Sequence, residues 1–285
     1  MKRMLATLLL FLLILGCKKV ETKTEGINIE QKKQMVNVIL FFPDSNNKFL
    51  HAESREIVFD KSLERTILNE LIKGPKTLGL VNPIPNGTRI LSINKNEDTL
   101  IVNFSSEFVK NHPGGADKER MTIYSIVNSL TEIPGIKNVQ FEIGGRKYDT
   151  YKGNIAINTP LNRNRDLFNR DKKRTPNEVL KLQMTFEKQG KWLDAYLLMS
   201  DDENNTYRKY YNDYVKEMEE TKALGFLDTD FVVGNFSLEP SKTKARVKVN
   251  FYEVDSTGKK VLGKDLYFTC VKVNGAWMVD WLTAQ

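Results

Sequence analysis

The chain contains two histidines, His51 and His112, so an enzyme site that needs an imidazole base has two candidates. Both fall in expected loops, and His112 is followed directly by Pro113 and two glycines. A Ser-His-Asp or Cys-His site would require one of these rings beside a nucleophile inside a cleft. We interpret His112 as a structural loop residue and expect no catalytic residues. A hydrolase that acts in the cell wall is the disfavoured alternative.

Metal and phosphate sites are not expected either. The densest acidic group is Asp201-Asp202-Glu203, which we interpret as the start of a helix, where carboxylates are favoured, rather than as a ligand set. Gly74-Pro75-Lys76-Thr77 lacks the upstream glycine of a phosphate loop and follows a predicted helix. Cys270 alternates with Leu266 and Phe268, which predicts a small buried residue on one face of a strand.

Six aromatic residues in the second half of the chain are candidates for lining a ligand pocket. They are Trp192, Tyr196, Tyr207, Tyr211, Trp277 and Trp281. Such rings bury large apolar surfaces, and those of tyrosine and tryptophan also carry a polar group that suits an interface. Two interpretations stay open. The rings fill the core of a domain, which we favour, or they surround a cavity.

Cys17 decides where the protein is located. It follows Ile14-Leu15-Gly16 at the end of an apolar run that begins at Leu5, after the basic Lys2 and Arg3. These are the parts of a secretory signal, and the run is too short for a comfortable transmembrane helix. The tetrapeptide that ends in Cys17 resembles the lipobox of bacterial lipoproteins, with Ile where Leu is usual. The resemblance implies that Cys17 becomes the first residue and carries diacylglyceryl and palmitate chains. These chains would anchor the protein to the outer face of the cytoplasmic membrane. The alternative is a plain signal peptide or a cysteine in a buried helix.

The net charge of +7 is concentrated in one short segment. Residues 160–174 contain six basic side chains against Asp166 and Asp171. The basic residues are Arg163, Arg165, Arg170, Lys172, Lys173 and Arg174. We interpret this segment as a solvated linker, with attraction to anionic lipid headgroups as the alternative. Because no domain-wide basic face is expected, the composition argues against a nucleic-acid partner. The polar residues 18–34 are interpreted as a flexible tether.

Residues 35–159 are expected to form the first folded domain, in the order strand, strand, helix, hairpin, helix, strand. The predicted elements are a strand at 36–42, a strand around Ile57 and Phe59, a helix at 62–73, a hairpin of 88–94 and 99–104, a helix at 117–132 and a strand at 139–143. Gly74-Pro75 should end the first helix, because glycine accepts a left-handed conformation and proline does not continue a helix. Two helices against a largely antiparallel sheet make an α+β arrangement.

A series of short motifs runs along residues 36–150 in a consistent order. They are Leu71-Ile72-Lys73-Gly74-Pro75, Leu80-Val81-Asn82-Pro83-Ile84-Pro85-Asn86-Gly87-Thr88, Val102-Asn103-Phe104-Ser105, Glu107-Phe108, His112-Pro113-Gly114-Gly115, Tyr124-Ser125-Ile126-Val127-Asn128-Ser129-Leu130-Thr131 and Val139-Gln140-Phe141. Together they resemble the GerM domain, a family of sporulation and spore germination domains. The resemblance implies an extracytoplasmic domain without catalytic residues, often borne on lipoproteins. The GerM family is similar to the ring-building motif of envelope secretion complexes, whose copies assemble by packing one domain against the next. Some members carry two such domains, whereas this chain shows one.

Residues 175–285 are expected to form the second domain. Thr175-Pro176-Asn177-Glu178 is typical of a capping box with proline at the first helical position, so a helix should run from there to Gly190. Two short helices and four alternating segments follow, the last two joined by the hairpin signal Asn274-Gly275. The four segments are 231–238, 244–254, 261–273 and 276–282. Helices followed by an antiparallel meander resemble the NTF2-like (cystatin-like) cone, which often encloses a pocket.

The sequence therefore predicts a two-domain α+β lipoprotein. Its expected segments are a signal peptide at 1–17, a tether at 18–34, a GerM-like domain at 35–159, a basic linker at 160–174 and an NTF2-like domain at 175–285. We expect a non-enzymatic interaction or assembly module that binds envelope proteins or further copies of itself, without a cofactor. Sporulation or germination is the process that the resemblance implies. The alternative is a lipoprotein that binds a small molecule or modulates a sensor through the NTF2-like cavity.

Overall fold

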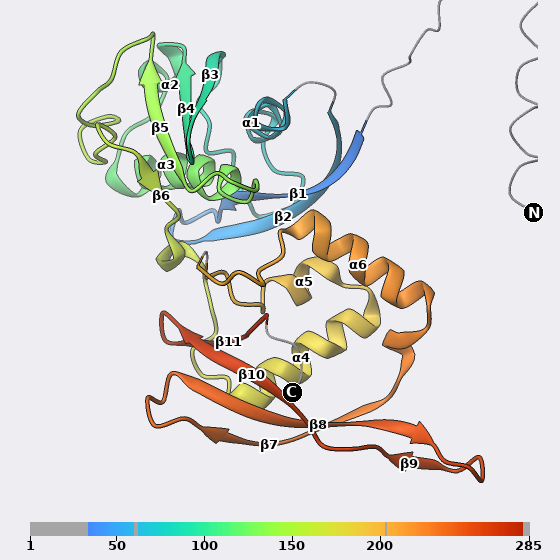
Figure 1. The fold of residues 1–285 in the computed structure, drawn as a ribbon. Helices are drawn as coiled ribbons and strands as arrows, with labels where there is room; N and C mark the ends of the chain where they lie inside the picture. Colours follow the sequence, from blue (N-terminus) through green and yellow to red (C-terminus); the bar gives the residue numbers. More distant parts are fainter. Residues whose placement is uncertain (1–33, 60–61, 203, 282–285) are drawn as a thin grey trace, which may run out of the picture. The chain divides into compact units, whose positions relative to one another are not determined.

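The structure is a computed structural model that describes residues 34–59, 62–202 and 204–281 (Figure 1). These residues belong to one compact unit that mixes helices and strands, as the predicted α+β class requires. We describe it as an N-terminal part, residues 34–159, a connecting segment, residues 160–174, and a C-terminal part, residues 175–281. The predicted signal peptide with Cys17, and nearly all of the predicted tether, lie outside the described residues.

The N-terminal part has the predicted order of elements, with one short additional helix, α2 (Glu107–Lys110), before the second predicted helix. They are β1 (Gln34–Pro43), β2 (Leu50–Phe59), α1 (Leu63–Lys73), β3 (Ile90–Asn96), β4 (Thr99–Phe104), α2 (Glu107–Lys110), α3 (Ala116–Leu130) and β5 (Asn138–Ile143). The strands form an antiparallel β1–β2 pair and a second sheet in the order β3-β4-β5-β6, where β6 (Leu161–Asn162) comes from the connecting segment. β4 and β5 are parallel, because the chain crosses over through α3 between them, and the other pairings are antiparallel.

Helix α1 begins and ends where the sequence predicts. Oγ of Ser62 accepts a hydrogen bond from the backbone N–H of Arg65 at 3.1 Å, which caps the first turn. At the other end Gly74 has a φ of 87°, and a Cβ at this position would lie 3.0 Å from Nδ2 of Asn82. Both the backbone conformation and the close approach therefore require glycine at the end of α1.

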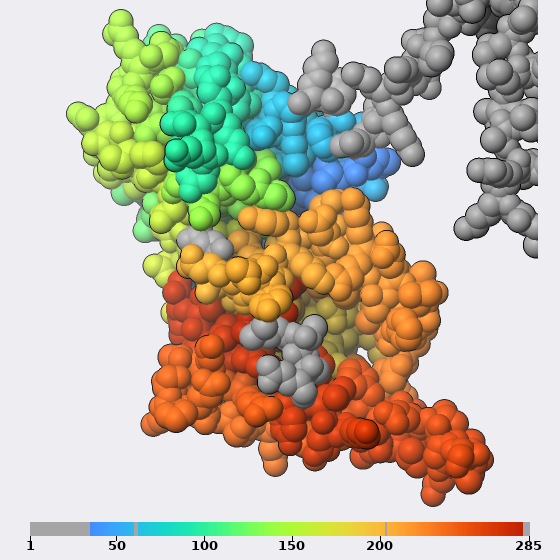
Figure 2. All heavy atoms as spheres, in the orientation of Figure 1, coloured from blue at the N-terminus to red at the C-terminus, as the bar shows by residue number. Residues whose placement is uncertain are grey.

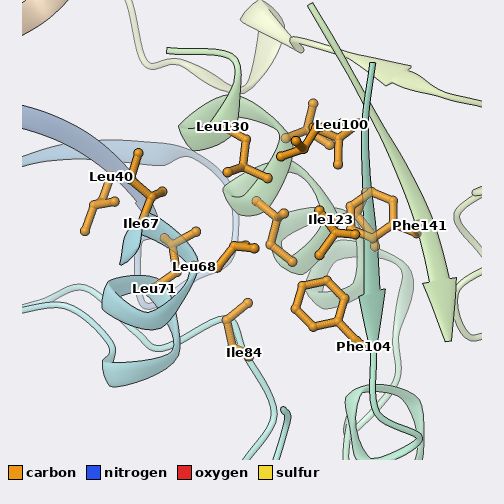
Figure 3. Packing of buried hydrophobic residues seen from close by; sticks show 14 of the residues in the cluster. Leu40, Ile67, Leu68, Leu71, Ile84, Leu100, Phe104, Ile123, Leu130 and Phe141 are labelled. Atoms are coloured by element: carbon orange, nitrogen blue, oxygen red, sulfur yellow. The ribbon is translucent and has the colours of Figure 1, made fainter. Parts of the chain in front are cut away.

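Strand β1 forms the wall between two hydrophobic cores. Leu40 and Phe42 face a core that α1, α3, β4 and β5 complete, and Figure 3 shows Leu40 in this core. Ile39 and Phe41 face a second core that includes α5 and α6. All four side chains are at most 2% exposed. Successive side chains of a strand point to opposite faces, so one apolar run contributes to both cores. This confirms that the run at 36–42 is interior.

The connecting segment, residues 160–174, packs against the folded parts. We predicted a solvated linker, and the structure shows that this is wrong. The segment contains β6 and the short helix η1 (Arg165–Leu167). The Phe168 ring stacks on the Phe41 ring of β1, and the Arg163 side chain is only 6% exposed. The prediction failed because a count of charges does not reveal carboxylates that are distant in sequence and close in space.

The C-terminal part places helices before an antiparallel sheet, as predicted. Its elements are α4 (Pro176–Gln189), α5 (Trp192–Tyr196), α6 (Tyr211–Ala223), η2 (Phe226–Asp228), β7 (Phe231–Leu238), β8 (Lys244–Val254), β9 (Lys260–Leu262), β10 (Leu266–Val273) and β11 (Ala276–Val279). The strand order is β11-β10-β8-β7, and β9 pairs with the far end of β8. The segment predicted as one strand at 261–273 is two strands. Nδ2 of Asn250 donates to the Gly263 carbonyl and to Asp265, which fixes the break between them.

Helix α4 connects the sheet to the rest of the C-terminal part. The backbone N–H of Thr175 donates to the Glu178 carboxylate at 2.7 Å, which confirms the predicted capping box, and Gly190 ends the helix with a φ of 72°. Val179 and Leu180 of α4 pack on the sheet in a third core. In Figure 1 the helices α4, α5 and α6 lie between the β1–β2 pair and the sheet. Figure 2 shows atoms of α6 directly against those of the first strands.

Candidate functional site

The C-terminal part contains a cavity of about 340 Å³ between α4, α6, η2 and the sheet. Most of its lining is apolar. This lining includes Met184, Met218, Phe231, Phe251, Phe268 and Trp281. The volume lies near the lower end of the range of roughly 300–1,000 Å³ that small-molecule sites occupy. A fully packed domain would exclude a ligand here, so this space keeps the ligand-binding alternative open.

Helix α4 places one ionisable carboxyl group, Glu187, on this cavity. The Tyr214 hydroxyl donates a hydrogen bond to its Oε1 at 2.8 Å. Burial raises the pKa of Glu187 above its usual range, although the side chains of Tyr214 and Gln183 act in the opposite direction. Burial also raises the pKa of Tyr214. A carboxyl group with a raised pKa, facing an apolar space, is suited to donate a hydrogen bond or a proton to a neutral ligand.

The structure brings together three of the six predicted pocket residues. The Tyr196 ring centroid lies 5.2 Å from that of Tyr211 and 5.8 Å from that of Trp281, both in edge-to-face contacts. The Tyr214 ring joins this cluster, at 5.4 Å from the Tyr196 ring and 6.0 Å from the Trp281 ring. The cluster fills the second core, as in the interpretation that we favoured, and Trp281 also lines the 340 Å³ cavity.

The other three predicted residues lie apart from this cluster. Trp192 is partly buried in the second core, with Nζ of Lys222 5.6 Å from its ring centroid. Tyr207 is 62% exposed. Trp277 lies on β11, where Nζ of Lys272 is 5.6 Å from its ring centroid. A role in ligand binding stays a prediction for all six residues.

The sequence reasoning missed Glu187. Its signal was available in the spacing, because Gln183 and Glu187 are four residues apart and share one face of α4. Gln183 is only 4% exposed. A pair of polar residues on the face of a helix that also carries Val179 and Leu180 indicates a polar site inside a domain.

Asp201 lies in a buried ion-pair network rather than at the start of a helix. Its carboxylate lies 2.7 Å from Nη2 of Arg170, 3.4 Å from Nε of Arg165 and 3.8 Å from Nε of Arg163. Burial would raise the pKa of Asp201, but the three arginines outweigh it and hold the pKa below its usual range. The predicted helix start is wrong, because residues 201 and 202 are not helical and α6 begins at Tyr211.

Glu132 is the second carboxylate of this network. It follows α3 and forms ion pairs with Arg163 of the connecting segment and Arg208 of the loop before α6. The Tyr196 hydroxyl donates to the same carboxylate at 3.3 Å. These four residues come from parts of the chain that are far apart in sequence. The network therefore fixes the connecting segment against both the N-terminal and the C-terminal parts.

His112 is a buried structural residue, as predicted. Its Nδ1 accepts a hydrogen bond from the backbone N–H of Gly114 at 3.0 Å. The Thr122 hydroxyl lies 3.1 Å from Nε2 and donates to the Pro83 carbonyl, so Nε2 must carry the proton. Burial lowers the pKa of His112, and both ring nitrogens of the neutral form are used to hold the loop. His51 lies on β2, so its predicted loop position is wrong.

Cys270 is buried on β10, as predicted, and burial raises the pKa of its thiol to about 12. Within residues 34–59, 62–202 and 204–281, no group of three or more His, Cys, Asp and Glu residues could hold a metal ion. In the same ranges, no helix combines the length and the apolar character needed to cross a bilayer.

Residues 39–149 match the family model named Germane, which is described as sporulation and spore germination. No curated protein matches the chain. Among solved structures, a protein from Clostridium perfringens described as a candidate lipoprotein is 28% identical with a TM-score of 0.34. That likeness covers 45% of this chain and 87% of the other. The first GerMN domain of the sporulation protein GerM from Bacillus subtilis is 21% identical with a TM-score of 0.38. It covers 46% and 98% of the two chains.

An NTF2-like protein of unknown function from Shewanella oneidensis is 13% identical with a TM-score of 0.25, covering 36% of this chain and 88% of that one. At these TM-scores the similarity to solved structures does not establish a family. The family assignment therefore depends on the match of residues 39–149. That match spans β1 from Ile39 onward, the three N-terminal helices and β5, the elements that carry the motifs of the sequence. This chain is therefore a protein that carries a Germane domain, a sporulation and spore germination domain, at residues 39–149.

Proposed function

We propose that this protein is an extracytoplasmic lipoprotein whose Germane domain is a non-enzymatic protein–protein interaction module of the cell envelope. The family match at residues 39–149 is the observation that carries this proposal. The motif Ile14-Leu15-Gly16-Cys17 supports an anchor on Cys17 at the outer face of the cytoplasmic membrane. The family description, sporulation and spore germination, supports one of these two processes as the setting of the module.

The use of polar side chains in the Germane domain supports a non-enzymatic role. Both ring nitrogens of His112 hold the neighbouring loop. The Glu119 carboxylate accepts hydrogen bonds from the backbone N–H and the side-chain amide of Asn154, at 3.0 and 2.6 Å. These two groups are thus committed to the fold, which supports binding to other proteins as the activity of the domain.

Crosslinking in intact cells tests the interaction module. A photoreactive residue is placed at Leu78 of the Germane domain, which is 98% exposed, and crosslinked neighbours are identified by mass spectrometry. A matched control carries the same residue at Leu224 of the C-terminal part, which is 72% exposed. Recovery of an envelope protein or of a second copy from position 78 supports the proposal. An uncrosslinked monomer at both positions contradicts it.

Cell fractionation tests the anchor separately. The Cys17→Ser variant should leave the membrane fraction, because the residue that would carry the acyl chains is gone. Cys270→Ser is the matched control and should stay with the membrane, since this thiol is buried in the fold. Equal membrane retention of Cys17→Ser and the parent protein would rule out the anchor.

The cavity with Glu187 and Tyr214 favours a second candidate function, the binding of a neutral small molecule. The neutral dye N-phenyl-1-naphthylamine serves as the probe, and its fluorescence should rise saturably on entering the apolar space. Met184→Trp, which fills the cavity from α4, should suppress the signal. A parent protein without a saturable signal would remove this candidate and leave the interaction module untouched.

A further inference from the structure

A second cavity, of about 210 Å³, lies where the connecting segment meets β1, β2 and the C-terminal part. Three arginines of the connecting segment line it, namely Arg163, Arg170 and Arg174. Arg174 pairs with Asp171, which also lines the cavity, with Nε 3.2 Å from the carboxylate. The other two arginines belong to the buried network around Glu132 and Asp201.

That network has more positive than negative charge. Ion pairs within 4 Å connect four guanidinium groups to two carboxylates. The members are Arg163, Arg165, Arg170, Arg208, Glu132 and Asp201, with side chains between 5% and 23% exposed. Burying a charge without a partner is costly, so an excess of two positive charges favours an anion nearby.

Several polar atoms of this network have no hydrogen-bond partner, and two of the arginines concerned line the cavity. Among the described residues, Nη1 of Arg163 and Nη1 of Arg170 are buried and have no hydrogen-bond partner. Both side chains approach the same oxygen, Oδ2 of Asp201. The Phe168 ring positions both guanidinium groups, whose central carbons lie 5.4 and 5.3 Å from its centroid. Two donors held in this way suit an oxyanion, because guanidinium nitrogens bind carboxylate and phosphate oxygens strongly.

Besides Glu132 and Asp201, the two carboxylates of the network, the remaining walls of the cavity are mostly apolar. They include Leu50, Ala52, Val179, Leu198, Met278 and Trp281. The volume is below the roughly 300 Å³ at which pockets for drug-sized ligands begin, so the occupant is small. Apolar walls beside a charged end indicate a molecule with an anionic head and a hydrocarbon body.

We propose that this cavity binds a small amphiphile that carries an oxyanion, either a carboxylate or a phosphate, on a short hydrocarbon. The guanidinium groups of Arg163 and Arg170 bind the oxyanion, and the hydrocarbon lies against the apolar walls. The ligand then touches β2 of the Germane domain and β11 of the C-terminal part. This inference stands independently of the proposed interaction module.

Tryptophan fluorescence tests the site in the full chain, reconstituted in phosphatidylcholine nanodiscs, because Trp277 and Trp281 both line the cavity. Octanoate and octyl phosphate are the two anionic probes, and they distinguish the carboxylate from the phosphate. At least one should bind saturably with a Kd below about 1 mM, and octanol should bind about tenfold more weakly or not at all. Inorganic phosphate tests whether the anionic group binds without a hydrocarbon chain. If inorganic phosphate binds as tightly as octyl phosphate, the proposal that the ligand is an amphiphile is wrong.

Three variants assign the binding to this cavity. Arg170→Lys keeps a positive charge near Asp201 but removes the guanidinium group. It should weaken the binding of the anionic probe about tenfold. Ala52→Leu adds volume inside the cavity, keeps all the arginines and should have the same effect. Arg146→Lys, at an exposed turn, is the control and should bind like the parent protein. Equal affinity for octanol, unchanged binding in both cavity variants, or no saturable signal with either anion overturns the proposal.

Discussion

The Phe168 ring stacks on the Phe41 ring, with centroids 4.9 Å apart and an angle of 28° between the ring planes. Phe41 is in the second core and 2% exposed, and Phe168 comes from the connecting segment. The stack therefore attaches that segment to β1, the strand whose opposite face contributes to the core of the Germane domain. We infer that the described residues unfold as one cooperative unit.

Phe168→Ala should lower the free energy of unfolding by about 3 kcal/mol, because the substitution removes the stacked ring and leaves a cavity beside Phe41. Urea denaturation monitored by circular dichroism measures the change. Phe226→Ala is the matched control, since Phe226 is 67% exposed and its loss should cost less than about 0.5 kcal/mol. Equal effects of the two substitutions would show that the segment does not support β1.

Local sequence patterns predicted the helices, strands and caps that depend on short-range interactions. The two-sided apolar run of β1, the stop of α1 at Gly74 and the capping box at Thr175 all depend on residues within a few positions of one another. Such features can be predicted directly from the sequence, because strand alternation, helix periodicity and helix caps involve only residues close together in the chain. The predicted order of elements was confirmed for the same reason, apart from the additional helix α2 and the division of the segment at 261–273 into β9 and β10.

The candidate sites depend on long-range contacts and were harder to predict. Arg163 and Arg208 meet Glu132 from positions 31 and 76 residues away along the chain, so their charges were assigned to solvent or left unassigned. Glu187 was missed because the apolar space around it is built by α6, η2 and the sheet together. Without the fold, the sequence does not tell which polar residue of an amphipathic helix faces a cavity.

Thr175→Ala should destabilise the protein by about 1 kcal/mol, because the substitution removes the N-cap side chain of the capping box at the start of α4. Thermal unfolding followed at 222 nm reports the loss as a lower Tm. Thr185→Ala in the middle of the same helix is the control. The Thr185 hydroxyl only donates to the Lys181 carbonyl one turn back, so its removal should be close to neutral. A neutral Thr175→Ala would mean that the cap adds nothing.

Cys270 should be inert to thiol reagents in the folded protein. Its side chain is buried beside the Pro176 carbonyl, and burial raises the pKa of the thiol to about 12, so the reactive thiolate is scarce at neutral pH. In a Cys17→Ser variant Cys270 is the one remaining cysteine. Ellman's reagent should detect no thiol in that variant before denaturation and one thiol per chain in guanidinium chloride. Rapid modification under native conditions would place Cys270 at an open surface.

Lowering the pH from 8 to 5 should reduce stability through His112. Burial lowers the pKa of His112 in the folded protein, whereas the unfolded chain titrates near the ordinary value of about 6.5. The unfolded state therefore binds more protons, so the stabilising contribution is complete above that value and declines as the pH falls from it toward the folded pKa. Urea denaturation at several pH values should show a smaller decline in His112→Gln than in the parent protein. His51→Gln leaves this ring intact and should keep the full decline. Identical slopes in His112→Gln and the parent would refute the assignment.

Glu187 should act on stability in the opposite direction. Burial raises the pKa of this carboxyl group in the folded protein, so the folded state holds its proton more tightly than the unfolded state does. Its contribution is therefore complete below about pH 4.3, the ordinary glutamate value, and is lost as the pH rises through the folded pKa. Glu187→Gln never ionises, so this variant should be more stable than the parent protein at pH 8, with the advantage disappearing near pH 4.

An exposed carboxylate with the opposite pKa shift provides the control for this measurement. Lys188 and Lys260 lie 2.6 and 2.5 Å from the Asp230 carboxylate and lower its pKa to about 2. Asp230 therefore stabilises the fold in its ionised form, and Asp230→Asn should be less stable than the parent protein at pH 8. Urea denaturation of both variants at pH 4 and pH 8 measures the two stability changes, which should have opposite signs at pH 8. If Glu187→Gln is less stable than the parent protein at pH 8, as Asp230→Asn should be, then Glu187 stabilises the fold as a carboxylate. The cavity would in that case hold an anion rather than a proton donor.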